Sequence, residues 1–249
     1  MPHTQQGISL KHGNIMDNIK GIIFDYGGTI DSRGEHWSEV IYRGWKYAGI
    51  NADKNTFRDC YVYAERELAR NRYILPQYNF RDLLYIKATI ELEEYVRHCA
   101  SPPKYVSPLA SKIADYCDKS ARMCIDEARP TLEYLSAKYP MVLVSNFYGN
   151  VDSVLREYDL RKYFRGVIES AVVGVRKPDP RIFMLGVVAL GLKPEETLVV
   201  GDSLKKDILP AEKIGCKTAW IKGKGWTADE DAATHPSQIK SLSELETLY

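Results

Sequence analysis

The sequence predicts an α/β fold, in which a parallel β-sheet carries helices on both faces and a helical domain is inserted into it. In the later part of the chain, short apolar runs alternate with helical segments, which is the pattern of βαβ units. One interval between two apolar runs is far too long for a simple crossover connection. Over a hundred residues separate Asp25 from Ser145, and most of them are helical in pattern.

Five apolar runs are predicted to form the strands of this sheet. Each run is short and bounded by turn-forming or polar residues, as expected for strands buried on both faces. The runs are Lys20–Asp25, Met141–Asn146, Gly166–Glu169, Thr197–Asp202 and Lys217–Ile221.

Helical segments separate the later strands. They are predicted at 129–138, 151–158, 180–190 and 204–214. Pro130 is well placed to start the first of these helices, because proline is favoured in the first turn. Gly215 is positioned as the C-cap of the last one. Ser241 and Glu244 have the spacing of a capping box, which predicts a short helix at the end of the sequence.

The long interval is best explained as a helical domain inserted after the first strand, since a structureless loop of that length is implausible in a compact protein. Its helical segments are 37–48, 54–71, 80–99 and 108–124. We therefore expect the inserted domain at 32–128 and the sheet domain at 20–31 and 129–249. Residues 1–19 are polar and lack the apolar core of a signal peptide, so we expect a flexible N-terminus.

Composition excludes several classes of function. The 249 residues hold 34 Lys and Arg against 33 Asp and Glu, for a formal charge of +1. No global field would attract nucleic acid or an anionic membrane, and no basic stripe with interleaved aromatic residues is present. No apolar run approaches the roughly 20 residues of a membrane span. The five cysteines are scattered without a CxxC motif, so we expect reduced thiols in a cytoplasmic protein.

Polar residues follow the predicted strands where the carboxyl ends of a parallel sheet meet, which is the place where such sheets bind ligands. These residues are Asp25, Ser145, Asn146 and Asp202, joined by Asp207 one helical turn after Asp202 and by Lys177 in a proline-rich turn. Carboxylates that converge in this way need a cation to offset their repulsion. Mg²⁺ is suited to that position because it prefers oxygen ligands.

Four segments together resemble the four motifs of the haloacid dehalogenase-like (HAD) hydrolase superfamily. They are Phe24-Asp25-Tyr-Gly-Gly-Thr29-Ile-Asp, Leu143-Val-Ser145-Asn146, Arg176-Lys177-Pro178-Asp179 and Gly201-Asp202-Ser-x-x-x-Asp207-Ile. Each segment alone has an ordinary structural explanation, such as a turn or a helix N-cap. Their order and their places at strand ends carry the resemblance, which extends from residue 20 to about residue 222.

The resemblance implies a Rossmann-like core and a Mg²⁺-dependent phosphatase of a small phosphorylated metabolite. Asp25 corresponds to the nucleophile that forms an aspartyl-phosphate, and Lys177 would neutralise both nucleophile and phosphate. The phosphoryl group would be bound by Thr29, Ser145, the backbone N–H of Asn146, and Lys177. The metal would be held by Asp25, the Gly27 carbonyl, Asp202 and Asp207, the last directly or through a water.

The inserted helices resemble the C1-type cap of this family, which closes over the site and excludes water. Most of the cap's many aromatic residues are expected to pack its helices. The alternative is that one or two line the pocket and favour a substrate with a flat or apolar part. Arg66, Arg70 and Arg72 could meet a second anionic group, although a solvated helix face is the simpler interpretation.

Position 27 departs from the phosphatase pattern, which has a second aspartate two residues after the nucleophile. Gly27 cannot donate a proton to the leaving oxygen, and losing a general acid costs about 10²–10⁴-fold in rate. A phosphatase with a substitute donor, such as Asp31 or a cap carboxylate, or with good leaving groups remains the favoured interpretation. The alternative is a catalytically weak or inactive member that binds a phosphorylated metabolite or a partner protein. A phosphonatase using Lys46, Lys54 or Lys87, or a dehalogenase, is less favoured, and the retained Asp202 and Asp207 argue against the latter.

Overall fold

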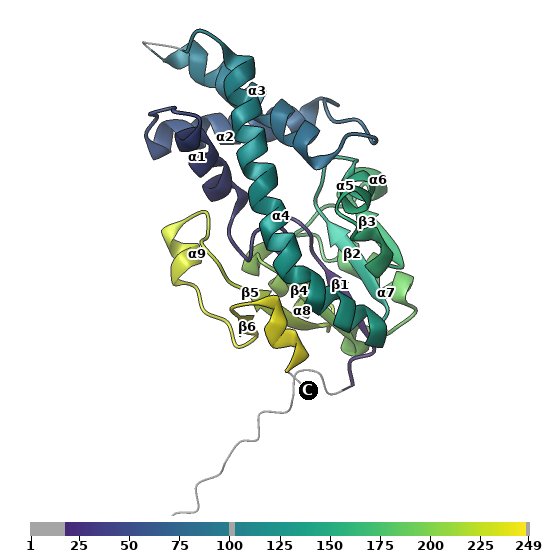
Figure 1. Ribbon diagram of the computed structural model, residues 1–249. Helices are drawn as coiled ribbons and strands as arrows, with labels where there is room; N and C mark the ends of the chain where they lie inside the picture. The colour runs from purple at the N-terminus through teal and green to yellow at the C-terminus, as the bar shows by residue number, and fades with distance from the viewer. Residues whose placement is uncertain (1–17, 100–102, 248–249) are drawn as a thin grey trace, which may run out of the picture.

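The computed structural model describes residues 18–99 and 103–247, which form a six-stranded parallel sheet beneath a helical cap (Figure 1). The strand order is β3-β2-β1-β4-β5-β6, and every neighbouring pair is parallel. The strands are β1 (Gly21–Phe24), β2 (Met141–Ser145), β3 (Gly166–Glu169), β4 (Thr197–Gly201), β5 (Lys217–Ile221) and β6 (Gln238–Ile239). The predicted α/β fold is confirmed, and β6 is a short addition at the edge that the sequence analysis did not predict.

The cap contains α1 (Trp37–Tyr47), α2 (Lys54–Arg70), α3 (Phe80–His98) and the first part of α4 (Val106–Lys138). The helices of the core are α5 (Val151–Glu157), α6 (Ser170–Val173), α7 (Arg181–Leu190), α8 (Leu209–Lys213) and α9 (Ala228–Ala232). A π-helical turn at Leu204–Ile208 precedes α8, and the predicted capping box at Ser241 opens a 3₁₀ turn at Leu242–Glu246. Among the described residues, no helix combines the length and the apolar character that crossing a membrane would require.

Helices cover both faces of the sheet because successive strand residues point to opposite sides. Ile22 and Phe24 of β1 belong to a hydrophobic cluster that includes residues of α4 and α5. Ile23, between them, belongs to a second cluster with residues of α7. Both faces of the central strand are therefore buried, which explains why its sequence reads as a continuous apolar run.

The chain returns from the cap to the core inside one continuous helix, α4, which runs past the sheet in Figure 1. The prediction of two helices, one ending near Cys124 and one starting near Pro130, is wrong. Pro130 lies inside α4 and is exposed, as is Asp126. The carbonyl of Asp126, which loses its helical donor at the proline, can therefore bind water instead.

The N-terminal segment predicted to be flexible falls mostly on residues 1–17, which lie outside the described residues. Ile19 is already buried in the core. The backbone N–H of Lys20 donates to the carbonyl of Glu196 at 2.8 Å, which aligns β1 with β4. All five cysteines are free, and four of them are buried.

Candidate active site

The loop after β1 places Asp25 beside Asp202 at the carboxyl edge of the sheet. The backbone N–H of Asp25 donates to the Val200 carbonyl at 2.9 Å. Gly28 has a φ of +97°, and a Cβ atom there would lie 2.4 Å from the Asp202 carboxyl carbon. Only glycine fits this turn, for reasons of both conformation and space. The Thr29 hydroxyl then lies between the two carboxylates, 3.3 Å from Asp25 Oδ2 and 3.2 Å from Asp202 Oδ1.

Lys177 ties two of the carboxylates together. Its Nζ lies 2.7 Å from Asp25 Oδ1 and 2.7 Å from Asp207 Oδ1, and all three side chains are buried. Burial alone would lower the pKa of Lys177, but the carboxylates of Asp207 and Asp25 raise it above its usual range. The lysine is therefore held as an ammonium between two acids.

Asn146 holds the loop that carries Lys177. Its Oδ1 accepts from the Lys177 backbone N–H at 2.9 Å, and its Nδ2 donates to the Lys177 carbonyl at 3.1 Å. The side chain of Asn146 is thus engaged with the backbone of Lys177 at both its oxygen and its nitrogen. Ser145, the last residue of β2, is buried and lines the same cavity.

The turn after β4 brings in Asp207. The backbone N–H of Ser203 donates to Asp207 Oδ2 at 3.0 Å. A Cβ atom at Gly201 would lie only 2.4 Å from the Cβ of Asp207, so this approach also requires glycine. Burial raises the pKa of Asp202 well above its usual range, and the nearby Asp207 and Asp25 carboxylates raise it further. Such repulsion favours either a bound proton or a bound cation.

The acidic cluster has the composition of a hard-metal site. One carboxylate oxygen from each of Asp25, Asp202 and Asp207 lies within 4.8 Å of the others. The three carboxylates and the ammonium of Lys177 together carry two formal negative charges. The Gly27 carbonyl borders the same cavity and accepts no hydrogen bond from the described residues. All-oxygen donors with a residual charge of this size fit Mg²⁺.

The space beside Gly27 is open. A Cβ atom built there meets only the Cδ1 of Trp37 within 4 Å, at 4.0 Å, and the backbone is not in the left-handed region. Asp31, which the sequence analysis considered as a substitute proton donor, is buried and does not line the cavity. Its Oδ1 accepts from the Gly28 N–H at 2.7 Å and from Trp37 Nε1 at 3.0 Å. Asp31 therefore braces the loop after β1 against α1, and burial raises its pKa to about 7.

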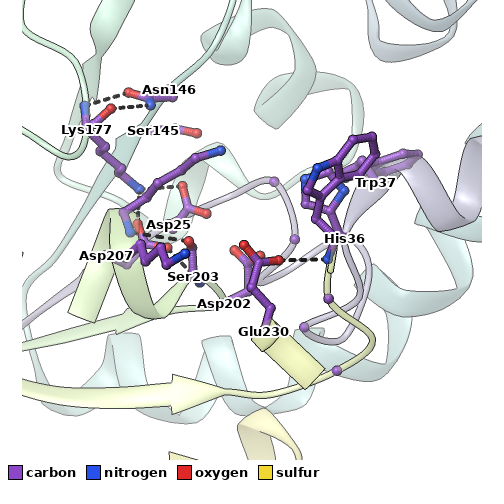
Figure 2. Close-up of a pocket in the computed structure, with 18 of the residues that line it drawn as sticks. Asp25, His36, Trp37, Ser145, Asn146, Lys177, Asp202, Ser203, Asp207 and Glu230 are labelled. Carbon is purple, nitrogen blue, oxygen red and sulfur yellow. Dashed lines mark hydrogen bonds and ion pairs between the residues drawn. The ribbon is translucent and has the colours of Figure 1, made fainter. Parts of the chain in front are cut away.

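A cavity of about 590 Å³ lies over these residues, between the cap and the core. Figure 2 shows Lys177, Asp25 and Asp207 gathered together, with His36 and Trp37 across the pocket. Of the predicted site residues, seven line the cavity: Asp25, Gly27, Ser145, Asn146, Lys177, Asp202 and Asp207. Thr29 is 1% exposed and lies behind the carboxylates rather than on the cavity wall.

The cap wall carries polar residues that sequence reasoning did not single out as a pair. Lys87 of α3 is buried and forms an ion pair with Glu65 of α2. Tyr148, from the loop after β2, donates to Glu65 Oε1 at 2.8 Å and so links core to cap. Burial would lower the pKa of Lys87, but Glu65 raises it well above its usual range. The ion pair with Glu65 favours the ammonium form of Lys87 over the free amine that a Schiff base requires, so the geometry does not support phosphonatase chemistry at this lysine.

The other basic residues considered for the cap are directed elsewhere. Lys46 donates to the Ala52 carbonyl at 2.5 Å, and Lys54 pairs with Glu39 at 2.7 Å. Three further basic residues of the cap are exposed and do not line the cavity: Arg66, Arg70 and Arg72. The only signal for the Glu65–Lys87 pair was the presence of charged residues among the apolar positions of two cap helices.

Comparison with known proteins defines the class. The model of the haloacid dehalogenase-like hydrolase family matches residues 19–215, most of the chain. The chain belongs to this family of hydrolases.

Two curated relatives match shorter stretches. A glyceraldehyde 3-phosphate phosphatase from Pyrococcus furiosus is 42% identical over 71 residues, which are 28% of this chain and 29% of that protein. A phosphoserine phosphatase from Thermus thermophilus is 34% identical over 86 residues, or 34% of each chain. The chain thus spans about a third of the length of these relatives.

The fold also matches a solved structure over nearly its whole length. A protein described as a HAD-hydrolase, YfnB from Bacillus subtilis, solved bound to magnesium, superposes with a TM-score of 0.58 at 19% identity. That match covers 92% of this chain and 98% of the other. At this level of identity, the similarity shows a shared fold.

Proposed function

We propose that this protein is a Mg²⁺-dependent phosphatase of a small phosphorylated metabolite that acts through an aspartyl-phosphate on Asp25. The observation that carries the proposal is the placement of Asp25 at the cavity floor, bonded to Lys177 and Thr29 and clustered with Asp202 and Asp207. The names of the two phosphatase relatives support the same reaction. We further propose that residues 32–128 act as the cap and that 20–31 and 129–249 act as the catalytic core.

Each residue of the site has a separate role in phosphoryl transfer. Thr29 holds the second oxygen of Asp25, so the carboxylate is oriented before substrate arrives. Lys177 supplies positive charge to the attacking carboxylate and to the phosphoryl oxygens, while Ser145 and the Asn146 backbone N–H bind those oxygens. A Mg²⁺ held by Asp25, the Gly27 carbonyl, Asp202 and Asp207 would supply further charge neutralisation.

Two displacements at phosphorus complete the cycle. A carboxylate oxygen of Asp25 forms a bond to phosphorus as the bond from phosphorus to the leaving oxygen breaks, and that oxygen keeps the electron pair. A water oxygen then attacks the same phosphorus, releases inorganic phosphate and restores the Asp25 carboxylate, giving its proton to solvent. Catalysis is mainly positioning and charge stabilisation.

We infer that none of Gly27, Asp31 and Glu65 gives a proton to the leaving oxygen. Gly27 has no side chain, and Asp31 lies outside the cavity wall. The cap carboxylate Glu65 is a poor acid: burial would raise its pKa, but Lys87 and Tyr148 hold that pKa below its usual range. We therefore infer that the preferred substrates are esters or anhydrides of acidic alcohols or acids, which leave readily as anions.

A second candidate function, favoured by Gly27 alone, is binding of a phosphorylated metabolite without turnover. Release of inorganic phosphate from phenyl phosphate and acetyl phosphate, with Mg²⁺ and with a chelator, separates the two. The phosphatase proposal expects turnover that disappears on chelation and returns with Mg²⁺. Tight binding of phosphate in Mg²⁺, with neither compound hydrolysed, would favour the binding protein.

Mg²⁺ affinity is expected to depend on Asp202. Asp202→Ala removes one of three clustered carboxylates, so titration calorimetry with Mg²⁺ should show at least about a tenfold weaker Kd. Asp229→Ala is the matched control, because Asp229 borders the same cavity but is exposed and outside the cluster. Equal affinities for wild type and Asp202→Ala would place the metal elsewhere.

Lys177 is expected to matter far more than its exposed neighbours in the cavity. Lys177→Ala should lower kcat by about 10²–10³-fold, the usual cost of removing one preorganised electrostatic contact. Lys205→Ala and Lys206→Ala should change kcat by less than about threefold, because both lysines are exposed and outside the ion-pair cluster. Steady-state kinetics, with circular dichroism to confirm folding, measures the three variants. Equal losses of kcat in all three variants would show that the phosphate does not bind beside Lys177 as proposed.

A further inference from the structure

Two groups of aromatic side chains line the cavity above the acidic cluster. The first aromatic wall consists of His36, Tyr61 and Trp226, with ring centroids 5.4 Å apart for Tyr61 and Trp226 and 5.2 Å apart for His36 and Trp226. It is shared between cap and core, because Trp226 follows β5. The second aromatic wall consists of Trp37, Phe80 and Phe147, with 5.2 Å between the centroids of Trp37 and Phe80. All six residues border the cavity.

The cap wall presents no unpaired charge to a substrate. Of its described residues that border the cavity, only Glu65 and Lys87 are charged, and they pair with each other. Tyr148 satisfies Glu65 further, and the Lys87 ammonium lies 4.2 Å from the centre of the Tyr61 ring. Burial lowers the pKa of His36 to about 4, helped by Lys206 and Lys87. His36 is therefore neutral near pH 7. An ionic group held against this cap wall would lose hydration without gaining an unpaired partner there, because the cations Lys205 and Lys206, unpaired among the described residues, belong to the core side of the cavity.

The absence of an acid at position 27 also restricts the leaving group, independently of the charges on the cap wall. An alkoxide is a poor leaving group without a proton, whereas a phenolate or a carboxylate leaves unaided. A small carboxylate such as acetate has no ring to place against the aromatic side chains that line the cavity. A phenol satisfies both restrictions, since it is acidic enough to leave and flat enough to lie between aromatic walls.

We propose that the substrate of this site is the phosphate monoester of an uncharged aromatic alcohol, with its ring held between the two aromatic walls. This inference rests on the proposed phosphatase function and names its substrate class. The bond from phosphorus to the phenolic oxygen breaks as the bond from Asp25 to phosphorus forms. The electron pair leaves with the phenolate, which takes a proton from solvent water after release.

The test compares esters that differ in shape but not in leaving-group acidity. Phenyl phosphate is paired with a fluoroalkyl phosphate whose alcohol is matched to phenol in pKa, and phosphoserine and acetyl phosphate complete the set. We expect kcat/KM for phenyl phosphate to exceed that of the matched fluoroalkyl ester by about tenfold or more. Equal values, or faster hydrolysis of phosphoserine, would overturn the substrate class while leaving the phosphatase proposal intact.

Variants of the aromatic walls test whether these rings cause the preference for phenyl phosphate. Tyr61→Leu and Trp226→Leu should each reduce the phenyl preference by about threefold or more, mainly through KM, and leave the fluoroalkyl ester little changed. Tyr47→Leu, which removes an aromatic ring 67% exposed on α1, is the matched control and should change neither. An unchanged preference in both wall variants would show that the rings do not hold the leaving group.

Binding provides a readout that does not depend on turnover. In the presence of Mg²⁺, phenylphosphonate should bind about tenfold more tightly than cyclohexylphosphonate, whose ring is similar in size but not flat. Hydrolysis of none of the four compounds would contradict the phosphatase proposal, and this comparison would then still decide the aromatic inference. Equal affinities for the two phosphonates would overturn it.

Discussion

Replacing Asp25 by asparagine is expected to reduce turnover of phenyl phosphate on the order of 10⁴-fold or more, the scale typical of losing a covalent nucleophile. The amide keeps the shape of the carboxylate, and its oxygen can still accept from Lys177 or Thr29. Its oxygen is too weak a nucleophile to attack phosphorus, so kcat should fall much more than substrate binding.

Steady-state kinetics with a parallel measurement of phosphate binding checks this expectation. Asp229→Asn makes the same chemical change at an exposed carboxylate on the cavity border, and it should retain activity. A reduction in Asp25→Asn of less than about tenfold would mean that another group attacks the phosphorus.

Placing an aspartate at position 27 is expected to raise turnover of alkyl phosphates by about 10²–10⁴-fold, which is the usual contribution of a general acid. The site can accept the side chain, because its Cβ would meet only Trp37, at 4.0 Å, and the backbone conformation is an ordinary one. Turnover by wild type should depend steeply on the pKa of the leaving group, and turnover by Gly27→Asp should depend on it only weakly.

A series of esters from alkyl to aryl, measured in both proteins, provides the comparison. Gly27→Asn is the matched control, because it has the size of aspartate but no carboxyl proton to donate. Similar rates for alkyl and aryl esters in wild type would show that another residue supplies the proton. An equal gain in Gly27→Asn would attribute the effect to packing against Trp37 rather than to proton transfer.

Much of the fold could be predicted because the strands are buried on both faces and read as uninterrupted apolar runs. β1 and β4 end directly before Asp25 and Asp202, so their meeting at one sheet edge followed from parallel pairing alone. β6 escaped prediction because two residues, Gln238–Ile239, carry no periodicity. The continuity of α4 escaped it because a proline usually marks a helix start, whereas Pro130 lies within the helix at an exposed position.

The positions of the site residues that directly follow strands could be predicted from the sequence. The side-chain contacts that depend on tertiary packing could not. The sequence suggested that Lys177 would meet the carboxylates, and it lies between two of them. It did not show that the Asn146 side chain forms hydrogen bonds with the Lys177 backbone, because the partner of a side-chain amide cannot be read from the sequence. The pairing of Glu65 with Lys87 joins two cap helices and is equally invisible to periodicity.

The central claim, that Asp25 carries the phosphoryl group during turnover, is tested most directly by acid quenching of wild type reacting with phenyl phosphate and Mg²⁺, followed by peptide mass spectrometry. Because Gly27 supplies no base to activate the hydrolytic water, the second displacement should be slow and the phosphoenzyme should accumulate. We expect one phosphoryl group on the peptide that contains Asp25, and a burst of phenol that approaches the enzyme concentration. Steady turnover with no phosphorylated peptide, or with the phosphoryl group on another residue, would contradict this account.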